Sequence, residues 1–302
     1  MSIIALDIGG TFVKAGIFEN EKLREYSEFP TKAHQGANAL LERCSKYIQE
    51  NLRDKTESLE AIGISTRGQV DILKGSIIFA HDSIKNYTGI NIRRYFEDIF
   101  NVPVYVENDV NSAAYGELKY GAGRYMNDKS FLCLTVGTGV GGAIIENGKI
   151  RHGKSFQAAE FGAMITHAED VRKNKYRSGS FENYASTKAL VKLCKKVDPS
   201  IRSAKDVFRN ANRPEINHCI NIWAKEFSIG LVTLIYLFNP ENIIIGGGIM
   251  QQKMLIKKIR HQLHFLLMES FQGINVITAE LGNKAGLIGI ACLTKEFISP
   301  NY

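Results

Sequence analysis

The chain has 302 residues and a formal charge of +7, a length that favours two domains over a single core. Its composition is typical of a soluble globular protein, and no segment approaches the roughly 20 apolar residues that cross a bilayer. Five scattered cysteines, none in a Cys-x-x-Cys pair, argue against disulfides and cysteine-based zinc sites and favour a reducing cytoplasm.

Met1-Ser2 leads directly into an apolar run, so we expect no signal peptide. The positive charge would suit nucleic acid, but the lysines are dispersed, and the densest basic cluster, residues 172–177, has the composition of a solvated loop. A basic surface also suits a protein that handles nucleotides. We therefore expect no nucleic-acid or membrane partner. The oligomeric state stays open, with a homodimer among the options.

The first half of the chain predicts three strands and then alternating helices and strands. Its strands are expected near 3–8, 12–18, 23–29, 59–65 and 102–106, and its helices near 36–52, 90–100 and 109–120. Apolar residues at helical spacing, such as Leu40, Leu41 and Cys44, support the first helix.

The second half predicts a similar order of elements. Its strands are expected near 130–136, 140–146, 242–245 and 274–279, and its helices near 187–197, 204–210, 214–238, 252–269 and 285–296. This alternation predicts an α/β fold with mixed sheets. Because Gly121-Ala122-Gly123 interrupts a helix, we place the boundary between domains 1–120 and 121–302, with the last helix able to pack back on the first domain.

The opening strands of the two halves resemble each other in register. An apolar strand runs into a glycine turn at 4–11 and again at 131–138, and the matches continue downstream at a constant offset. The matched pairs are Gly10 and Gly137, Thr11 and Thr138, Glu19 and Glu146, Asn20 and Asn147, and Lys22 and Lys149. Two such loops facing each other could hold a polyphosphate between them.

The first glycine loop contains groups that suit a phosphate and its metal. Asp7 ends a predicted buried strand and could hold Mg²⁺ through water. Gly9 and Gly10 let the backbone approach phosphate oxygens, while Thr11 and Lys14 add donors. An ordinary Gly-Gly hairpin turn is the alternative interpretation.

The second glycine loop is harder to explain as a plain turn. Gly137, Thr138, Gly139 and Gly141 lie in a segment with four glycines between 137 and 142, which is costly in backbone entropy. Together with the register match, this favours contact with phosphate.

A third glycine cluster follows the predicted strand 242–245. Gly247 and Gly248 stand where ligands of open α/β sheets bind, and they could admit an adenine or ribose. A turn into the next helix is the alternative.

Asn108 and Asp109 follow a predicted strand and open a helix. Asp109 could be an N-cap, the commoner outcome for such a residue. An amide beside a carboxylate can also bind adjacent hydroxyls, and the carboxylate can accept a proton from one of them.

Two glutamates of the second half are further candidates. Glu160 lies among small and apolar residues, where a charge needs a partner or a ligand. Glu182 could instead cap the helix that follows. His152 and His167 have no metal-ligand spacing with any cysteine or histidine, and we interpret both as structural.

Taken in order, these motifs resemble the ROK family of sugar kinases and repressors over essentially the whole chain. The resemblance implies a duplicated actin-like (ribonuclease H-like) ATPase fold, with two domains whose mixed sheets are flanked by helices. It also implies ATP and Mg²⁺ as cofactors and a small sugar as substrate.

The resemblance implies a role for each motif. Asp109 would be the catalytic base for a 6-hydroxyl. Sugar contacts would come from Gly68, Asn108, Asp109, Glu160 and Glu182. Nucleotide contacts would come from Asp7, Gly9, Gly10, Thr11, Lys14, Gly137, Thr138, Gly139, Gly141, Gly247 and Gly248, and Asp7 would hold Mg²⁺ through water.

Three departures from the family pattern matter. The family's repressors have an N-terminal helix-turn-helix arm, whereas this chain starts directly with the first strand, which favours a kinase. Zinc-binding members have cysteines before the second sugar-binding glutamate. This chain has no cysteine between Cys133 and Cys194, so no zinc site is expected. Ala163 replaces the family histidine that supports zinc and sugar.

The resemblance leaves the sugar open. Gly63-Ile64-Ser65-Thr66 and the segment 181–186 resemble N-acetylmannosamine kinases, and we favour that sugar. A glucokinase or a β-glucoside kinase of the same family is the alternative. A non-catalytic sugar-binding regulator and an actin-like ATPase are rivals from other classes.

Overall fold

The computed structural model describes residues 2–55, 58–81, 84–175 and 177–299, which leaves Tyr176 of the basic cluster undescribed. The chain forms two compact units. Unit 1 comprises Met1–Tyr125, Gly148–Ala158 and Asn283–Tyr302, and unit 2 comprises Met126–Asn147 and Ala159–Gly282. These bounds differ from the predicted division at residue 120, because the helix at 285–298 packs on strands of unit 1 and His152 contacts Glu107.

Unit 1 contains a five-stranded sheet in the order β3-β2-β1-β4-β7. Strands β1, β2 and β3 form an antiparallel meander, and β4 and β7 continue the sheet in parallel with β1. The bounds are β1 (Ser2–Ile8), β2 (Phe12–Glu19), β3 (Lys22–Pro30), β4 (Leu59–Thr66) and β7 (Val104–Asn108). The unit also contains a hairpin that the sequence had not indicated, β5 (Gln69–Asp71) with β6 (Ser76–Phe79).

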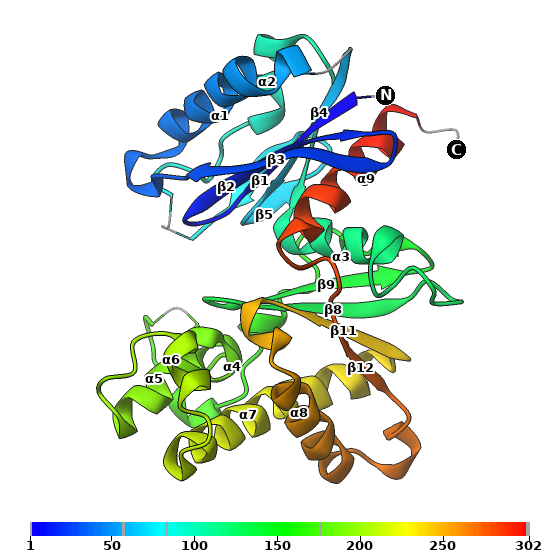
Figure 1. Ribbon diagram of the computed structural model, residues 1–302. Coiled ribbons are helices and arrows are strands. Elements are labelled where there is room, and N and C mark those ends of the chain that lie inside the picture. The colour runs from blue at the N-terminus through cyan, green and yellow to red at the C-terminus, as the bar shows by residue number, and fades with distance from the viewer. Residues whose placement is uncertain (1, 56–57, 82–83, 176, 300–302) are drawn as a thin grey trace. The chain divides into compact units, whose positions relative to one another are not determined.

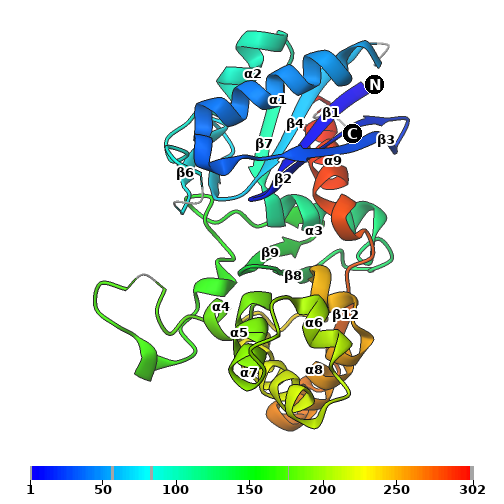
Figure 2. The ribbon, with the colours of Figure 1, turned by 60° about the vertical axis from the view of Figure 1, so that its left-hand side comes forward.

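Helices cover both faces of this sheet, α1 and α2 on one face and α9 on the other (Figure 1, Figure 2). Alternation along the strands explains the two faces. Ile4, Leu6 and Ile8 of β1 belong to a buried cluster with residues of α1 and α2, while Asp7 lies on the face covered by α9. The helix bounds are α1 (Ala37–Asn51), α2 (Ile92–Phe100), α3 (Asp109–Tyr120) and α9 (Ala285–Ile298).

Helices α3 and α9 approach so closely that their contact depends on glycine. A Cβ on Gly289 would lie 1.7 Å from the carbonyl oxygen of Ser112, and a Cβ on Gly116 would lie 2.4 Å from the carbonyl oxygen of Ala285. Because α3 begins at Asp109, α9 supports the helix that positions this carboxylate.

Replacing Gly289 with Val should therefore destabilise unit 1. The helices would have to separate, and overpacking of this kind costs roughly 1–3 kcal/mol. We expect thermal unfolding to start several degrees lower, whereas Gly273→Val, at a position with no atom within 4 Å of the added Cβ, should leave Tm nearly unchanged. Equal Tm values for the two variants would contradict the glycine contact.

The second sheet has the order β10-β9-β8-β11-β12, which repeats the order of the first, and its edge strand β10 is short (Lys149–Ile150). Strands β8 and β9 are antiparallel, and β11 and β12 continue in parallel with β8. The duplicated α/β fold with mixed sheets is therefore confirmed. The elements are β8 (Phe131–Val136), β9 (Val140–Glu146), α4 (Glu182–Ala185), α5 (Thr187–Val197), α6 (Ala204–Arg209), α7 (Pro214–Phe238), β11 (Asn242–Gly246), α8 (Lys253–Leu266) and β12 (Asn275–Thr278).

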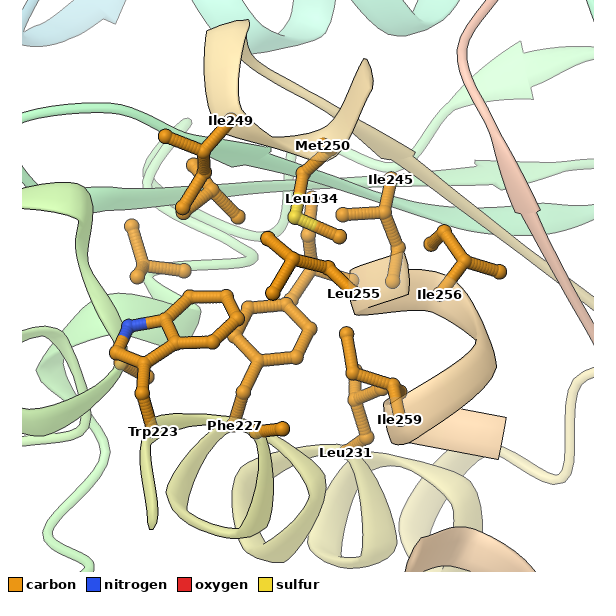
Figure 3. Close-up of a cluster of buried hydrophobic side chains, with 14 of the residues drawn as sticks. Leu134, Trp223, Phe227, Leu231, Ile245, Ile249, Met250, Leu255, Ile256 and Ile259 are labelled. Atoms are coloured by element: carbon orange, nitrogen blue, oxygen red, sulfur yellow. The ribbon is translucent and has the colours of Figure 1, made fainter. Parts of the chain in front are cut away.

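Helix α7 forms the core of unit 2 with α8 and the sheet. Figure 3 shows Trp223, Phe227 and Leu231 of α7 pointing toward Leu134 of β8 and Leu255 of α8. By length and composition alone this helix would pass as a membrane span, contrary to our expectation that no segment would. Its buried side chains account for the apolar composition as that of a core helix.

Candidate active site

The first glycine loop joins β1 to β2 in unit 1, and Asp7 lies beside it. Strand register places Lys14 opposite Asp7 across the antiparallel pair and Ser65 opposite it across the parallel pair. Nζ of Lys14 donates to Oδ2 of Asp7 at 3.0 Å, and Oγ of Ser65 donates to Oδ1 at 3.0 Å. Asp7 is 8% exposed, and its carboxylate is oriented by hydrogen bonds on both oxygens and compensated by the Lys14 ammonium.

The donor set near Asp7 fits a magnesium ion held through water. Mg²⁺ keeps several waters and usually takes one or two carboxylates together with substrate phosphates. Asp7 supplies one oriented carboxylate, and no group of three or more acidic, cysteine or histidine side chains that could hold a metal occurs among the described residues. A metal at this position would therefore depend on the phosphates of a bound nucleotide.

The turn after Asp7 leaves an exposed stretch of backbone. The amide of Gly9 donates to the carbonyl of Phe12 at 3.1 Å, and Oγ1 of Thr31 donates to the carbonyl of Gly9 at 2.9 Å. Gly10 and Thr11 are exposed. A Cβ on Gly10 would lie 2.7 Å from Nη1 of Arg67, so a side chain there would displace a guanidinium.

The second glycine loop joins β8 to β9 in unit 2. The amide of Gly137 donates to the carbonyl of Gly139, and the amide of Thr187 donates to the carbonyl of Gly137, both at 2.9 Å. A Cβ on Gly139 would lie 2.4 Å from Oε2 of Glu182. Gly137 and Thr138 are exposed. Glycine is therefore required at 139 because a predicted sugar-binding carboxylate lies against the loop.

Gly247 packs against the end of β8, next to this loop. Its φ of +111° suits glycine, and a Cβ would lie 2.1 Å from the carbonyl oxygen of Val136. Among the described residues, no atom apart from those of its chain neighbours lies within 4 Å of the Cβ position of Gly248. The close contact at Gly247 explains one glycine structurally, while the open space at Gly248 agrees with the predicted approach of a nucleoside.

Asn108 is the N-cap of α3, so the interpretation of Asp109 as a cap is wrong. Oδ1 of Asn108 accepts from the amides of Val110 and Asn111 at 2.8 and 3.1 Å. Its Nδ2 donates to the carbonyl of Gly68 at 2.9 Å. An N-cap side chain accepts from the amides two and three residues ahead of it, and here the side chain in that position is Asn108, one residue before Asp109.

Glu107 organises the backbone around these two residues, a role that sequence reasoning missed. It is 1% exposed, and its Oε1 accepts from the amide of Asn108 at 2.7 Å and from Nδ2 of Asn111 at 3.0 Å. Its Oε2 lies 2.7 Å from Nε2 of His152 and accepts from the hydroxyl of Tyr105 at 3.4 Å. His152 thus has a structural partner.

Asp109 is half-buried at the first turn of α3. Burial is the main cause that raises its pKa to about 6, and the negative charge of Asp7 adds to the rise. The positive charge of Arg67 opposes it, together with the amide of Val110. Tyr87 is a further titratable neighbour whose interaction with Asp109 is electrostatic. A carboxylate whose pKa lies close to neutral pH is suited to accepting a proton.

The raised pKa predicts a loss of activity in acid. A base acts in its ionised form, so kcat/KM for the acceptor should fall about tenfold per pH unit below a midpoint near pH 6. Rates between pH 4.5 and 8.5, with the folded state monitored by circular dichroism, would test this. A midpoint near pH 4, the range of an unperturbed carboxyl, would contradict the environment described for Asp109.

Arg177 joins the two candidate glutamates of unit 2. Its Nη2 donates to Oε2 of Glu160 at 2.9 Å, and its Nη1 donates to Oε1 of Glu182 at 3.0 Å. The side chain of Glu160 is 43% exposed, and Arg177 is the partner that its charge was expected to need. The structure therefore brings the two carboxylates together on one guanidinium, and that of Glu182 also lies beside Gly139.

Ala163, where the resemblance implies a histidine, ends a short 3₁₀ turn, Phe161–Ala163, directly after Glu160. Nearby, His167 stacks on Tyr184 with ring centroids 3.6 Å apart, and its Nε2 lies 3.3 Å from Oε2 of Glu226. These contacts tie the segment after Ala163 to α4 and α7 and give His167 a structural role.

Two sheets of the same order, each opening with a glycine loop, define a duplicated actin-like ATPase fold. In the first unit Asp109 follows the end of a strand, and in the second two glutamates share one arginine, with Glu182 beside a glycine loop. The chain belongs to the ROK family, whose profile matches residues 3–297. The predicted resemblance is therefore confirmed.

Several known proteins are similar to this chain. A β-glucoside kinase of Listeria innocua is 31% identical over 297 residues, which cover 96% of both chains. The structure of a ROK family glucokinase from Streptomyces griseus, with glucose and AMPPNP, has a TM-score of 0.84 and 27% identity over 98% of this chain and 100% of that one. A Listeria monocytogenes protein proposed as an N-acetylmannosamine kinase has a TM-score of 0.85 and 27% identity over the whole of both chains.

Proposed function

We propose that this ROK protein transfers the γ-phosphoryl group of ATP to the 6-hydroxyl of a hexose or N-acetylhexosamine, with N-acetylmannosamine the favoured acceptor. It is an ATP-dependent sugar kinase. The observation that most supports this is Asp109, a half-buried carboxylate with a pKa near 6 in the same unit as the Asp7–Lys14 glycine loop. A proton acceptor and a phosphate-binding loop are the parts that phosphoryl transfer to an alcohol requires.

The sugar class is supported by the relatives. They include kinases of β-glucosides and of glucose, and a protein proposed to phosphorylate N-acetylmannosamine. The amide of Asn108, the carboxylates of Glu160 and Glu182 and the backbone of Gly68 would bind the sugar hydroxyls. A carboxylate pair bridged by Arg177 presents several acceptors, which suits a polyhydroxylated ligand.

The nucleotide would be bound by residues of both glycine loops. Gly9, Gly10, Thr11 and Lys14 would contact phosphates, with Asp7 holding Mg²⁺ through water, and Mg²⁺ when bound neutralises charge on the β- and γ-phosphates. The corresponding residues of unit 2 would be Gly137, Thr138, Gly139, Gly141, Gly247 and Gly248. Asp109 would take the proton of the attacking hydroxyl.

A sugar panel tests the proposal. Purified protein is assayed for ADP release with MgATP and N-acetylmannosamine, glucose or cellobiose, and products are identified by mass spectrometry. We expect sugar-stimulated turnover, highest with N-acetylmannosamine, and a 6-phosphate product. Preference for glucose or cellobiose would move the assignment to the alternative kinases.

The same panel separates the rival classes. Sugar binding without turnover would instead indicate a regulator, and ATP hydrolysis unaffected by any sugar would indicate a conformational ATPase. For the cellular setting we propose the cytoplasm, since all five cysteines are free and buried.

A further inference from the structure

Arg67 places a guanidinium against the first glycine loop. Parallel pairing of β1 with β4 sets Ile8 opposite Thr66, so the loop after β1 and the residue after β4 leave the same edge of the sheet. Nη1 of Arg67 lies 2.7 Å from the position that a Cβ on Gly10 would occupy. The absence of a side chain at Gly10 is therefore what allows the guanidinium to rest on the loop backbone.

The same guanidinium interacts electrostatically with Asp109, the proposed base. Its positive charge is felt at Asp109, where it opposes the charge of Asp7. Arg67 also precedes Gly68, whose carbonyl accepts from Nδ2 of Asn108. Arg67 thus stands among the phosphate loop, the base and the loop expected to contact the sugar.

Lys14, a second cation near this loop in β2, uses one of its donors on Asp7. Its Nζ is bonded to Asp7 at 3.0 Å and compensates that carboxylate. Arginine also differs from lysine in presenting a planar fork of donors that matches two phosphoryl oxygens at once. The Arg67 guanidinium beside Gly10 is therefore suited to binding a phosphoryl group rather than to compensating Asp7.

We propose that Arg67 is a catalytic residue that binds the phosphoryl group passing from the nucleotide to the sugar. The inference rests on the proposed function and adds a residue to it. In the transfer, the sugar oxygen forms a bond to the γ-phosphorus, the bond to the β–γ bridging oxygen breaks, and ADP leaves. The hydroxyl proton goes to Asp109, while Arg67 keeps its protons and stabilises the charge on the equatorial oxygens.

Two substitutions test this role. Arg67→Gln keeps polarity and approximate length but removes the charge, and Arg67→Lys keeps the charge without the fork. We expect Arg67→Gln to lower kcat by roughly 10²–10³, at or below the low end of the range for arginines that assist phosphoryl transfer. Arg67→Lys should recover part of the loss. Arg24→Gln is the matched control, because Arg24 is an exposed arginine of β3 paired with Glu19.

Nucleotide affinity supplies a readout that does not need turnover. Calorimetry with a non-hydrolysable ATP analogue and with ADP, both with Mg²⁺, should show Arg67→Gln weakening the analogue at least tenfold and ADP less than threefold. The acid limb of kcat/KM should also move to higher pH in Arg67→Gln and stay in place in Arg67→Lys. Thermal unfolding checks that each variant folds.

The outcomes are separable. Arg67→Gln with kcat within threefold of the parent protein, or with equal losses of affinity for the analogue and ADP, would overturn the inference. A loss of sugar affinity alone would also overturn it, since it would place Arg67 in the sugar site. A parent protein with no sugar-stimulated turnover would defeat the proposed function, and the calorimetric comparison would still decide whether Arg67 contacts the γ-phosphate.

Discussion

Replacing Asp109 with Asn is expected to lower turnover by roughly 10²–10⁴, the usual contribution of a general base, while ATP affinity changes less than about twofold. In the parent protein Oδ1 of Asp109 accepts from the amide of Val110 at 3.0 Å. Asparagine keeps the shape of the side chain and an Oδ1 that can still accept this hydrogen bond. The start of α3 should therefore stay intact. The loss would fall on proton transfer, because an amide cannot accept the hydroxyl proton.

Steady-state rates with saturating sugar and MgATP, together with calorimetric ATP affinity, measure this effect. Asp98→Asn is the matched control, since Asp98 is an exposed aspartate of α2 in a weak pair with Arg94. The role of Asp109 as the base would be ruled out by an Asn variant that retains kcat within threefold of the parent protein.

The neighbouring glutamate is a poor substitute for Asp109 as the base. Glu107 is buried, and both of its oxygens are already engaged by the amide of Asn108 and the side chains of Asn111, Tyr105 and His152. A carboxylate that accepts this many hydrogen bonds is held in place by its neighbours. We therefore assign Glu107 to orienting the turn that presents Asp109, not to accepting a substrate proton.

Local patterns in the sequence predicted most of the fold. Apolar periodicity placed the long helices and the strands of both sheets within a few residues, and Pro214 and Asn239 marked the ends of α7 as observed. The hairpin β5–β6 was missed because its strands are only three and four residues long. Periodicity also gives no sign that the segment Gly148–Ala158 groups with unit 1, because that grouping depends on tertiary contacts such as that of His152 with Glu107.

The candidate site likewise contains residues that the sequence predicted and residues that it did not. The glycine loops and the Asn108–Asp109 pair stand out in sequence because their chemistry is concentrated in a few adjacent residues. Arg67 and Arg177 do not stand out, since an arginine in a loop is ordinary and gains meaning from partners elsewhere. Arg67 meets Gly10 through strand pairing, and Arg177 meets Glu160 through a loop whose course no periodicity predicts.

Gly139 was predicted from the sequence to be important, and the structure gives a second reason for its importance. The sequence favoured glycine there so that phosphate could approach the backbone. The structure adds a second cause, because the carboxylate of Glu182 occupies the space that a Cβ would need. A substitution at this position should consequently affect both substrates.

Replacing Gly139 with Val is expected to weaken nucleotide and sugar binding together. The added Cβ would lie 2.4 Å from Oε2 of Glu182, and the carboxylate cannot withdraw freely because Arg177 holds its other oxygen at 3.0 Å. Either the loop or the glutamate must move. We expect at least a tenfold rise in Kd for ATP and in KM for the sugar, each equivalent to about 1.4 kcal/mol.

Calorimetry and sugar-dependent rates measure the two effects separately, with Gly273→Val as the control in the same unit, at a position with open space around its Cβ. Loss of sugar affinity with unchanged nucleotide affinity would show that Glu182 moves and that the loop does not contact phosphate. Unchanged affinity for both would show that neither substrate uses this corner of unit 2. The predicted joint loss follows because one glycine separates a proposed phosphate loop from a proposed sugar ligand, so neither can be displaced without the other.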